Sequence, residues 1–274
     1  MSGERRCRST ALSMKHEQTN VNREVLMGKL TDKVAVITGA SKGIGAAIAR
    51  AFAAEGAAVV VNYTTSRHDA DIVVADITIK GGTASALQGD VSKSGDIERL
   101  FANARDAFGR VDILVNNAGI YRFAPVENVL EEDFHRHFNV NVLGVLLATK
   151  EAIKHFGPDG GSIINLSTAV TRNPPPGTSV YVASKSAVEA ITRVLAKELG
   201  PRKIRVNAIS PGEVETEGTR SAGIVGSDFE KQVLQQTPLG RIGQPDDIAL
   251  VAVFLASDDA RWVTGEVLVV SGGM

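Results

Sequence analysis

The chain has 274 residues, of which 43% are hydrophobic and 22% charged, and its formal net charge is -1 at pH 7. This balance is ordinary for a globular protein with a sizeable core, and it excludes the strongly basic surface of a nucleic-acid binder and the long apolar runs of a membrane protein. The only cysteine, Cys7, excludes a disulfide framework and a cluster of thiol metal ligands, which indicates a reducing cytoplasm.

The N-terminal residues 1–27 are polar, contain several arginines and include no apolar run as long as a signal-peptide core. We expect a flexible leader here. Met27 directly precedes the first organised segment, so the leader could reflect a translation start placed too far upstream; an arm that stabilises an oligomer is the alternative. No linker or repeat interrupts residues 28–274, which predicts a single domain.

Short β-branched apolar runs alternate with longer amphipathic stretches from Lys33 onward. In residues 96–108, for example, apolar side chains recur at helical spacing and give the helix one apolar face. This alternation predicts right-handed crossovers and a parallel sheet with helices on both faces, the doubly wound Rossmann α/β fold. The seven expected strands span residues 33–38, 58–62, 84–88, 111–115, 162–166, 204–209 and 267–270.

A glycine-rich turn follows the first expected strand and opens an alanine-rich helix over residues 46–54. Glycines let the backbone turn sharply and approach a pyrophosphate, and the start of a helix attracts the pyrophosphate charge. A dinucleotide site is therefore predicted, with a plain strand-to-helix turn as the alternative. The candidate contacts in this turn are Gly39, Ser41, Lys42, Gly43, Ile44 and Gly45.

Further motifs follow in chain order: Asp90-Val91, Asn116-Asn117-Ala118-Gly119, Asn141, Tyr181-x-x-x-Lys185 and Pro211-Gly212-x-Val214-x-Thr216. Together with the spacing Gly-x-x-x-Gly-x-Gly, this series resembles the short-chain dehydrogenase/reductase family from about Leu30 to the C-terminus. The resemblance implies that Asp90 and Val91 border the adenine, and that Asn117, Ala118 and Gly119 form the cofactor floor. It also implies that Tyr181, Lys185, Pro211, Gly212, Val214 and Thr216 contact the cofactor, with Thr216 on the nicotinamide side.

The end of the second strand bears on which nicotinamide cofactor binds. NAD-binding proteins place an acid there to hold the ribose hydroxyls, whereas this chain has Asn62, Tyr63 and Thr64 and no carboxylate before Asp69. Lys42, with Ser41, Thr64, Ser66 and Arg67 as possible neighbours, could bind a 2′-phosphate. NADP is therefore predicted and NAD remains possible; the alternative for Lys42 and Arg67 is a solvated surface position.

Tyr181 and Lys185 are four residues apart on an expected helix over residues 181–199, so they share one face of it. A neighbouring ammonium lowers the pKa of a phenol, which suits Tyr181 to act as general acid or base toward a carbonyl or secondary alcohol. The resemblance adds a hydroxyl thirteen residues before the tyrosine, which is Thr168, with Ser167 as the alternative. It also implies that Asn141 holds a water next to the lysine.

The segment of residues 211–240 turns polar and is expected to select a small-molecule substrate, because such loops commonly close over ligands. The chain is similar to 3-oxoacyl-[acyl-carrier-protein] reductases and to glucose 1-dehydrogenases. The alternatives are an NAD-dependent sugar or alcohol dehydrogenase and, in another class, a non-catalytic NADP-binding sensor or scaffold. Neither a nucleic-acid nor a membrane partner is expected.

No metal site is expected either, because His135 and His137 are two residues apart on an expected helix and point in different directions. We expect both to be surface residues. The family resemblance also implies a homotetramer, and it suggests that Trp262 and the residues up to Met274 form subunit contacts. A core position for Trp262 is the alternative.

Overall fold

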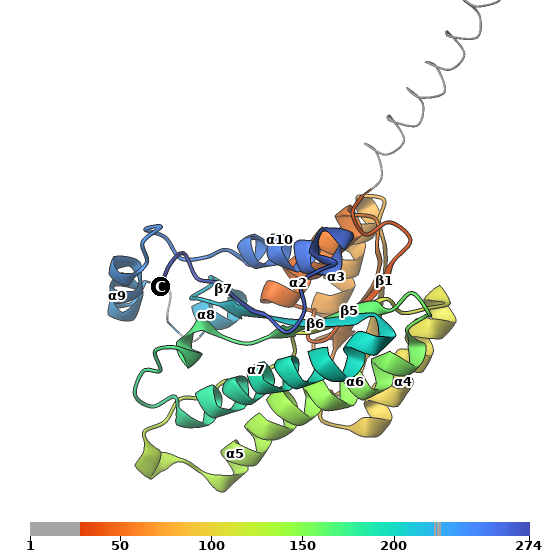
Figure 1. Cartoon of the computed structure of the whole chain (residues 1–274). Coiled ribbons are helices and arrows are strands. Elements are labelled where there is room, and N and C mark those ends of the chain that lie inside the picture. Colours follow the sequence, from red (N-terminus) through yellow and green to blue (C-terminus); the bar gives the residue numbers. More distant parts are fainter. Residues whose placement is uncertain (1–27, 222, 224–225) are drawn as a thin grey trace, which may run out of the picture.

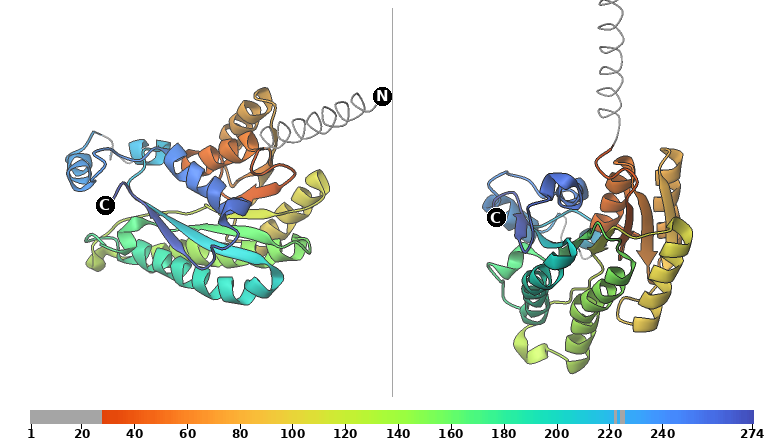
Figure 2. Two further views of the ribbon diagram at one scale, coloured as in Figure 1. Left: turned by 45° about the horizontal axis from the view of Figure 1, so that its top comes forward. Right: turned by 45° about the vertical axis from the view of Figure 1, so that its right-hand side comes forward.

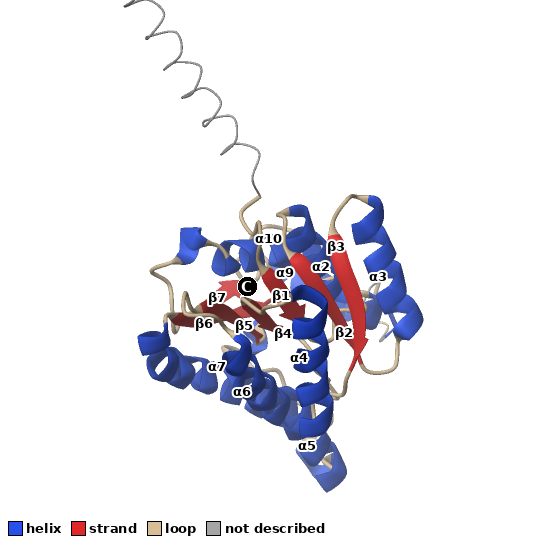
Figure 3. Ribbon diagram, turned by 90° about the vertical axis from the view of Figure 1, so that its right-hand side faces the viewer, coloured by secondary structure: helices blue, strands red, loops and turns tan. Residues whose placement is uncertain are grey.

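The computed structural model describes residues 28–221, 223 and 226–274, so the expected leader lies outside the described residues. Its centre is a sheet of seven parallel strands in the order β3-β2-β1-β4-β5-β6-β7 (Figure 3). The doubly wound fold predicted from the sequence is confirmed. The strands are β1 (Val34–Ile37), β2 (Ala58–Tyr63), β3 (Thr83–Gln88), β4 (Ile113–Asn116), β5 (Gly161–Leu166), β6 (Ile204–Pro211) and β7 (Val267–Val270).

Helices cover both faces of the sheet (Figure 1). One face carries α2 (Gly43–Ala54), α3 (Arg67–Ile79) and α10 (Pro245–Ala256), and the other carries α4 (Ser94–Phe108), α6 (Gly144–His155) and α7 (Ser179–Leu199). A shorter helix, α5 (Glu131–Phe138), leads into α6 through a π-helical turn at Asn139–Leu143. The segment with α8 (Glu217–Ser221) and α9 (Asp228–Gln236) lies on the same side of the molecule as the C-terminus (Figure 2).

Alternation along the strands divides the apolar side chains between two cores. Val59 and Val61 of β2 belong to the core under α2, α3 and α10, whereas Val60 belongs to the core under α4, α6 and α7. All four residues of β1 and all four of β4 are buried, because these strands lie in the middle of the sheet. The continuous β-branched runs of the sequence therefore mark strands that are covered on both faces.

The strand order reverses between β1 and β4, since the chain first builds β2 and β3 on one side and then crosses to the other. At such a point the loops that leave the carboxyl ends of the strands diverge and form a crevice for ligands. The glycine turn after β1, residues 117–119 after β4, residues 167–168 after β5 and residues 212–216 after β6 all leave the sheet at this edge. The topology thus gathers motifs that are far apart in the sequence.

Differences from the predicted elements are confined to their ends. α2 begins at Gly43 rather than at Ala46, so the second half of the glycine motif lies in its first turn. α7 begins at Ser179 rather than at Tyr181, and β6 continues to Pro211 rather than ending at Ile209. Across the described part of the chain, no helix combines the length and the apolar character needed to span a membrane.

The glycine turn after β1 is held by hydrogen bonds from Asn117, the residue that follows β4. Gly39 and Gly43 have φ values of 61° and 55°, a backbone conformation that favours glycine. Asn117 Nδ2 donates to the carbonyls of Thr38 (3.0 Å) and Gly39 (2.9 Å). A Cβ on Gly45 would lie 2.4 Å from that same Asn117 nitrogen, so only glycine leaves room for these hydrogen bonds.

We expect Gly45→Ala to lower the free energy of unfolding by about 1–3 kcal/mol, because the added methyl group overpacks a rigid turn. Gly95→Ala, in the first turn of α4, is the matched control: nothing lies within 4 Å of a Cβ there. The control should leave stability unchanged or raise it by up to about 1 kcal/mol. Urea unfolding followed by circular dichroism measures both variants, and equal effects would contradict the steric account.

Candidate active site

The side chains of Tyr181 and Lys185 lie one turn apart near the start of α7. The Lys185 side chain is buried, and its Nζ donates to the backbone oxygen of Leu166, 2.8 Å away at the end of β5. Burial lowers the pKa of Lys185 to about 8. Burial also raises the pKa of the Tyr181 phenol, while a hydrogen bond with the Thr168 hydroxyl acts in the opposite direction. The amine thus has a pKa near neutral pH, and the phenol one helical turn away remains protonated. The lowered phenol pKa predicted from the sequence is wrong, because burial of Tyr181 raises it.

Asn141 occupies the π-helical turn between α5 and α6, and its side chain is buried. Its Oδ1 accepts from the backbone N–H of Ile120 at 2.8 Å, and its Nδ2 donates to the Ile120 oxygen at 2.9 Å and to Ser184 Oγ at 3.0 Å. A Cβ on Gly119 would lie 3.2 Å from Lys185 Nζ and 3.4 Å from Asn141 Oδ1. Gly119 therefore leaves a small space that the lysine and the asparagine both border.

The two hydroxyl candidates after β5 have different surroundings. Ser167 is buried, and its Oγ donates to Glu189 Oε1 at 2.8 Å, on α7. Thr171 Oγ1 donates to the same carboxylate oxygen at 2.9 Å. Ser167 and Thr168 both line the substrate cavity, but it is the Thr168 hydroxyl that forms a hydrogen bond with Tyr181. The geometry favours Thr168 as the hydroxyl that meets a substrate, and it gives Ser167 a role in fixing the loop.

The glycine turn offers an anion site at the start of α2. The backbone N–H of Gly43 donates to Glu217 Oε2 at 3.0 Å, from α8. A carboxylate oxygen from a distant segment thus occupies a position that suits a phosphate oxygen. Gly39 and Gly45 keep side chains away from the same turn. The residues present therefore fit the pyrophosphate of a dinucleotide.

Lys42, at the N-cap of α2, forms an ion pair with Asp69 in the first turn of α3, with Nζ and Oδ2 2.9 Å apart. The sequence suggested no carboxylate close enough to oppose a 2′-phosphate, and this ion pair corrects that expectation. Arg67 is exposed and pairs with Asp71 at 3.5 Å. Lys42 is therefore the basic side chain that the fold directs to the glycine turn, with Asp69 as its partner.

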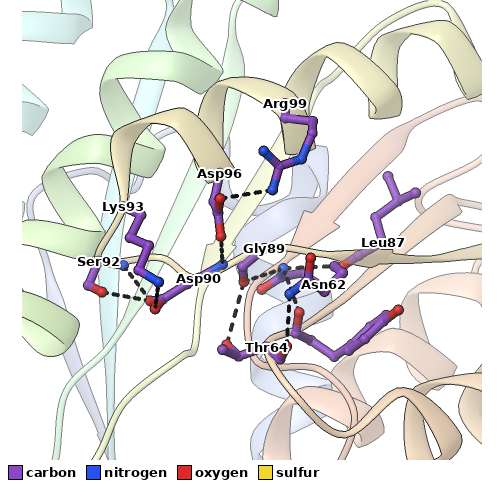
Figure 4. A network of polar contacts seen from close by, with 11 residues as sticks. Asn62, Thr64, Leu87, Gly89, Asp90, Ser92, Lys93, Asp96 and Arg99 are labelled. Carbon is purple, nitrogen blue, oxygen red and sulfur yellow. Dashed lines mark hydrogen bonds and ion pairs between the residues drawn. The ribbon is translucent and has the colours of Figure 1, made fainter.

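Asn62 and Thr64 join the end of β2 to the loop after β3 (Figure 4). Asn62 is buried; its Oδ1 accepts from Gly39 N at 3.2 Å and its Nδ2 donates to Gly89 O at 3.1 Å. Thr64 Oγ1 lies 3.5 Å from the same Gly89 oxygen. The Asn62 amide thus braces the glycine turn.

The carboxylate of Asp90 is fixed within the same network (Figure 4). Partial burial opposes its ionisation, but hydrogen bonds from Ser92 N (3.0 Å) and Ser92 Oγ (2.7 Å) outweigh this, and the pKa of Asp90 is lowered. Asp90 N–H donates to Asp96 Oδ2 at 3.0 Å. Asp90 is therefore a fixed anionic side chain at the β3 end of the crevice.

Three predicted cofactor contacts have side chains in the apolar interior. Tyr63 and Val214 belong to the core under α2, α3 and α10, and Val91 belongs to the opposite core. Of these three residues, Val214 also lines the cavity. Ile44, Pro211, Gly212 and Thr216 line the cavity.

The surface position predicted for His137 is wrong, because its side chain is 2% exposed. The ring lies between two backbone groups: its Nδ1 is 2.7 Å from Asp133 O, and its Nε2 accepts from Arg122 N at 3.0 Å. These contacts tie α5 to the loop after β4. His135 is exposed as predicted. Among the described residues, no group of three or more His, Cys, Asp or Glu side chains could hold a metal ion.

A cavity of about 580 Å³ opens above Tyr181 and Thr168. Its walls come from the loop after β4, the loop after β5, and the segment that follows β6. Tyr121 and Phe123 both contact Tyr181 edge to face, at centroid distances of 6.4 and 5.7 Å. The arrangement can hold a largely apolar molecule with a polar atom at the phenol.

Residues 39–274 match the family model described as enoyl-(acyl carrier protein) reductase. An uncharacterized oxidoreductase of Methylorubrum extorquens is 61% identical over 90% of this chain and 100% of its own. A hydroxynaphthalene reductase-like protein Arp2 of Metarhizium robertsii is 39% identical over 89% of this chain and 95% of its own. A 3β-hydroxysteroid dehydrogenase 1 of Eggerthella lenta is 42% identical over 89% of this chain and 94% of its own.

Solved structures agree. A short-chain dehydrogenase/reductase of Serratia marcescens superposes with a TM-score of 0.85 at 38% identity, covering 89% of this chain and 98% of its own. A short-chain dehydrogenase of Burkholderia cenocepacia in complex with NADP gives 0.84 at 35% identity, covering 90% and 99%. The fold and site thus define an oxidoreductase that interconverts carbonyl and CH–OH groups. The chain belongs to the short-chain dehydrogenase/reductase family.

Several residues at the site belong to no motif that could be recognised in the sequence. Ser184 and Glu189 orient Asn141 and Ser167 from α7, and helical spacing from Tyr181 was the only available signal. Tyr121 and Phe123 follow the Asn-Asn-Ala-Gly motif in a loop without periodicity. Glu213 lines the cavity directly after Pro211-Gly212. In the sequence it lies within the polar segment 211–240 and carries no motif of its own.

We expect Lys185→Met to raise the free energy of unfolding at pH 7 by about 1–3 kcal/mol. The reason is that the wild-type protein must bury a charged amine at this pH, since burial lowers the pKa of Lys185 from 10.5 only to about 8. Between those values the unfolded chain binds the extra proton, so wild-type stability rises with pH and the gain of the variant shrinks. Urea unfolding at pH 7 and 9.5 measures both effects. A variant less stable than wild type at pH 7 would show that the hydrogen bond to Leu166 outweighs desolvation.

Proposed function

We propose that this protein is an NADP(H)-dependent oxidoreductase that transfers hydride between the nicotinamide and the carbonyl or carbinol carbon of a small ring-containing substrate. The observation that carries the proposal is the placement of the Tyr181 phenol, beside Thr168 and one turn from Lys185, at the base of an apolar cavity. The names of the Metarhizium and Eggerthella relatives support a ring substrate, since they refer to a hydroxynaphthalene and a hydroxysteroid.

Bound in the crevice, NADP(H) would supply or accept the hydride. The glycine turn and Lys42 would hold its phosphates, and residues 117–119 and 212–216 would border the rest. Thr168 donates a hydrogen bond to the substrate oxygen and orients it. Tyr181 gives its proton to that oxygen during reduction, or removes the proton during oxidation. Lys185 stabilises the resulting phenolate, and Asn141 lies where a water can pass the replacement proton to the amine.

We expect Tyr181→Phe to lower turnover by roughly 10²- to 10⁴-fold, because the variant has no proton to transfer, while the Kd for the cofactor stays near wild type. Tyr121→Phe is the matched control, since it removes a second phenol from the same cavity and should change turnover less than about 10-fold. Steady-state rates and cofactor fluorescence measure both. Normal turnover in Tyr181→Phe would refute the mechanism. Cofactor binding without any turnover in the wild-type protein would favour the alternative of a non-catalytic NADP-binding sensor.

The choice of NADP rests on Lys42 and on the absence of an acid at the end of β2, and the NADP complex of the Burkholderia enzyme supports it. A specific observation favours NAD as the second candidate: the Asp69 carboxylate lies 2.9 Å from Lys42 Nζ. A phosphate on the ribose would have to share Lys42 with that carboxylate. The relative affinity for the two cofactors therefore depends on this pair.

We expect Lys42→Met to weaken NADPH binding about 10-fold or more and to leave NADH binding within about 3-fold, because a charged hydrogen bond to phosphate is lost. Asp69→Asn should tighten NADPH binding by removing the competing charge. Arg67→Met is the control, because its guanidinium pairs with Asp71 on the surface. Fluorescence titrations with both cofactors give the ratios. Tighter NADH than NADPH binding in wild type would establish the NAD alternative.

A homotetramer and a cytoplasmic location complete the proposal. Two separate apolar faces support the assembly: one on α5 and α6, with Phe134, Leu143 and Leu146, and one at α10, with Leu250 and Trp262. Trp262 is 97% exposed, which excludes the core alternative. Two independent self-complementary faces generate four subunits rather than two. The single cysteine supports a reducing compartment.

We expect Leu250→Asp and Leu146→Asp each to convert the tetramer to a dimer, because each charge disrupts one of the two faces. Ile79→Asp, an exposed apolar residue at the end of α3 and outside both faces, is the control. Light scattering coupled to gel filtration measures the mass. A monomeric wild-type protein would remove the assembly proposal.

A further inference from the structure

The walls of the cavity above Tyr181 are mainly apolar and partly aromatic. Tyr121 and Phe123 stack at 5.8 Å between centroids, and Val170, Pro175 and Pro176 line the cavity from the loop after β5. Rings of this kind bind a flat apolar molecule through its faces and edges. One carboxylate, that of Glu213, lines the same cavity.

The backbone of Glu213 is fixed at the end of β6. Its oxygen accepts from Gly243 N at 3.0 Å, and the next residue, Val214, is buried and bridges to Gly243. These contacts fix the backbone from which the half-buried Glu213 side chain extends. The carboxylate is held at the cavity wall, within electrostatic range of Tyr121 and Tyr181.

Across the described residues, no hydrogen-bond donor or cation of the protein is paired with the Glu213 carboxylate, although its neighbours along the chain are paired. Glu215 accepts from Arg220 and Gln244, and Glu217 accepts from Gly43. Burial raises the pKa of Glu213, and the charge of Glu230 on α9 raises it further. A half-buried carboxylate without a hydrogen-bond donor is unfavourable. A ligand that donates a hydrogen bond to Glu213 would therefore bind more tightly than one that does not.

We propose that Glu213 is a specificity-determining residue that accepts a hydrogen bond from a hydroxyl group of the substrate, on the part of the ring system remote from the reacting carbonyl. A hydroxyl fits better than an ammonium, because an ammonium would lose more hydration among the aromatic walls. Sites built to hydrogen-bond a substrate hydroxyl discriminate strongly against analogues that lack it. The inference rests on the proposed ketone chemistry, which it makes more specific.

The test compares 1-tetralone with the 1-tetralones that carry one hydroxyl on the aromatic ring. Isothermal titration calorimetry with the NADP⁺-loaded protein measures each Kd without turnover. In wild type, at least one hydroxylated ketone should bind about 10-fold tighter than 1-tetralone, as expected for a hydrogen bond to a charged group. Glu213→Leu should abolish this preference but bind 1-tetralone at least as well as wild type, which also shows that the variant is folded.

Glu213→Gln keeps a carbonyl acceptor without the charge and should retain part of the preference. Glu215→Gln is the matched control, because its carboxylate is paired with Arg220 away from the cavity, and it should retain all of it. A preference that survives in Glu213→Leu, or no preference in wild type, overturns the inference. Rates of NADPH oxidation are measured separately: a Glu213-dependent preference without turnover would overturn the proposed function and leave this inference standing.

Discussion

The burial of the Lys185 amine fixes the arrangement of the three candidate catalytic side chains, Lys185, Tyr181 and Thr168. Lys185 Nζ donates to the backbone oxygen of Leu166, so the end of β5 fixes the position of the lysine side chain relative to the sheet. Tyr181 lies one helical turn before Lys185, so its position on α7 is fixed as well. The loop after β5 places the Thr168 hydroxyl beside the phenol. The desolvation that lowers the lysine pKa to about 8 opposes folding at neutral pH. Such a destabilised arrangement is typical of a site selected for chemistry.

The cofactor end and the substrate end are linked through one segment. Glu217 follows directly after Thr216, and its carboxylate meets the Gly43 N–H that a phosphate oxygen would need. Under the proposed function, a phosphate oxygen of the dinucleotide would take the place of the Glu217 carboxylate, while Glu213, in the same segment, stays at the wall of the substrate cavity. The same short segment thus borders both the glycine turn and the substrate cavity.

The sequence predicted the strands and the order of the motifs, because buried parallel strands produce continuous β-branched runs and the switch point follows from the right-handed crossovers. It also predicted Lys185 and Asn141 as site residues, and the fold brings both to one small space beside Gly119. Side-chain contacts between neighbouring elements could not be predicted in this way. The contact of Lys42 with Asp69 depends on how α2 and α3 pack, and the burial of His137 depends on the loop after β4. Such contacts leave no periodicity in the chain.

Opposing influences around Tyr181 determine the protonation state of its phenol. Burial raises the pKa of the phenol, and the negative charge of Glu213 raises it further. Both influences keep the proton on Tyr181, which is the form required to protonate a carbonyl oxygen as it becomes an alkoxide. Lys185 favours the phenolate but, with a pKa of about 8, loses its own charge as the pH rises above neutrality. Under the proposed mechanism, Tyr181 therefore holds at neutral pH the proton that carbonyl reduction consumes, and the Glu213 charge that helps to keep it there lines the same cavity.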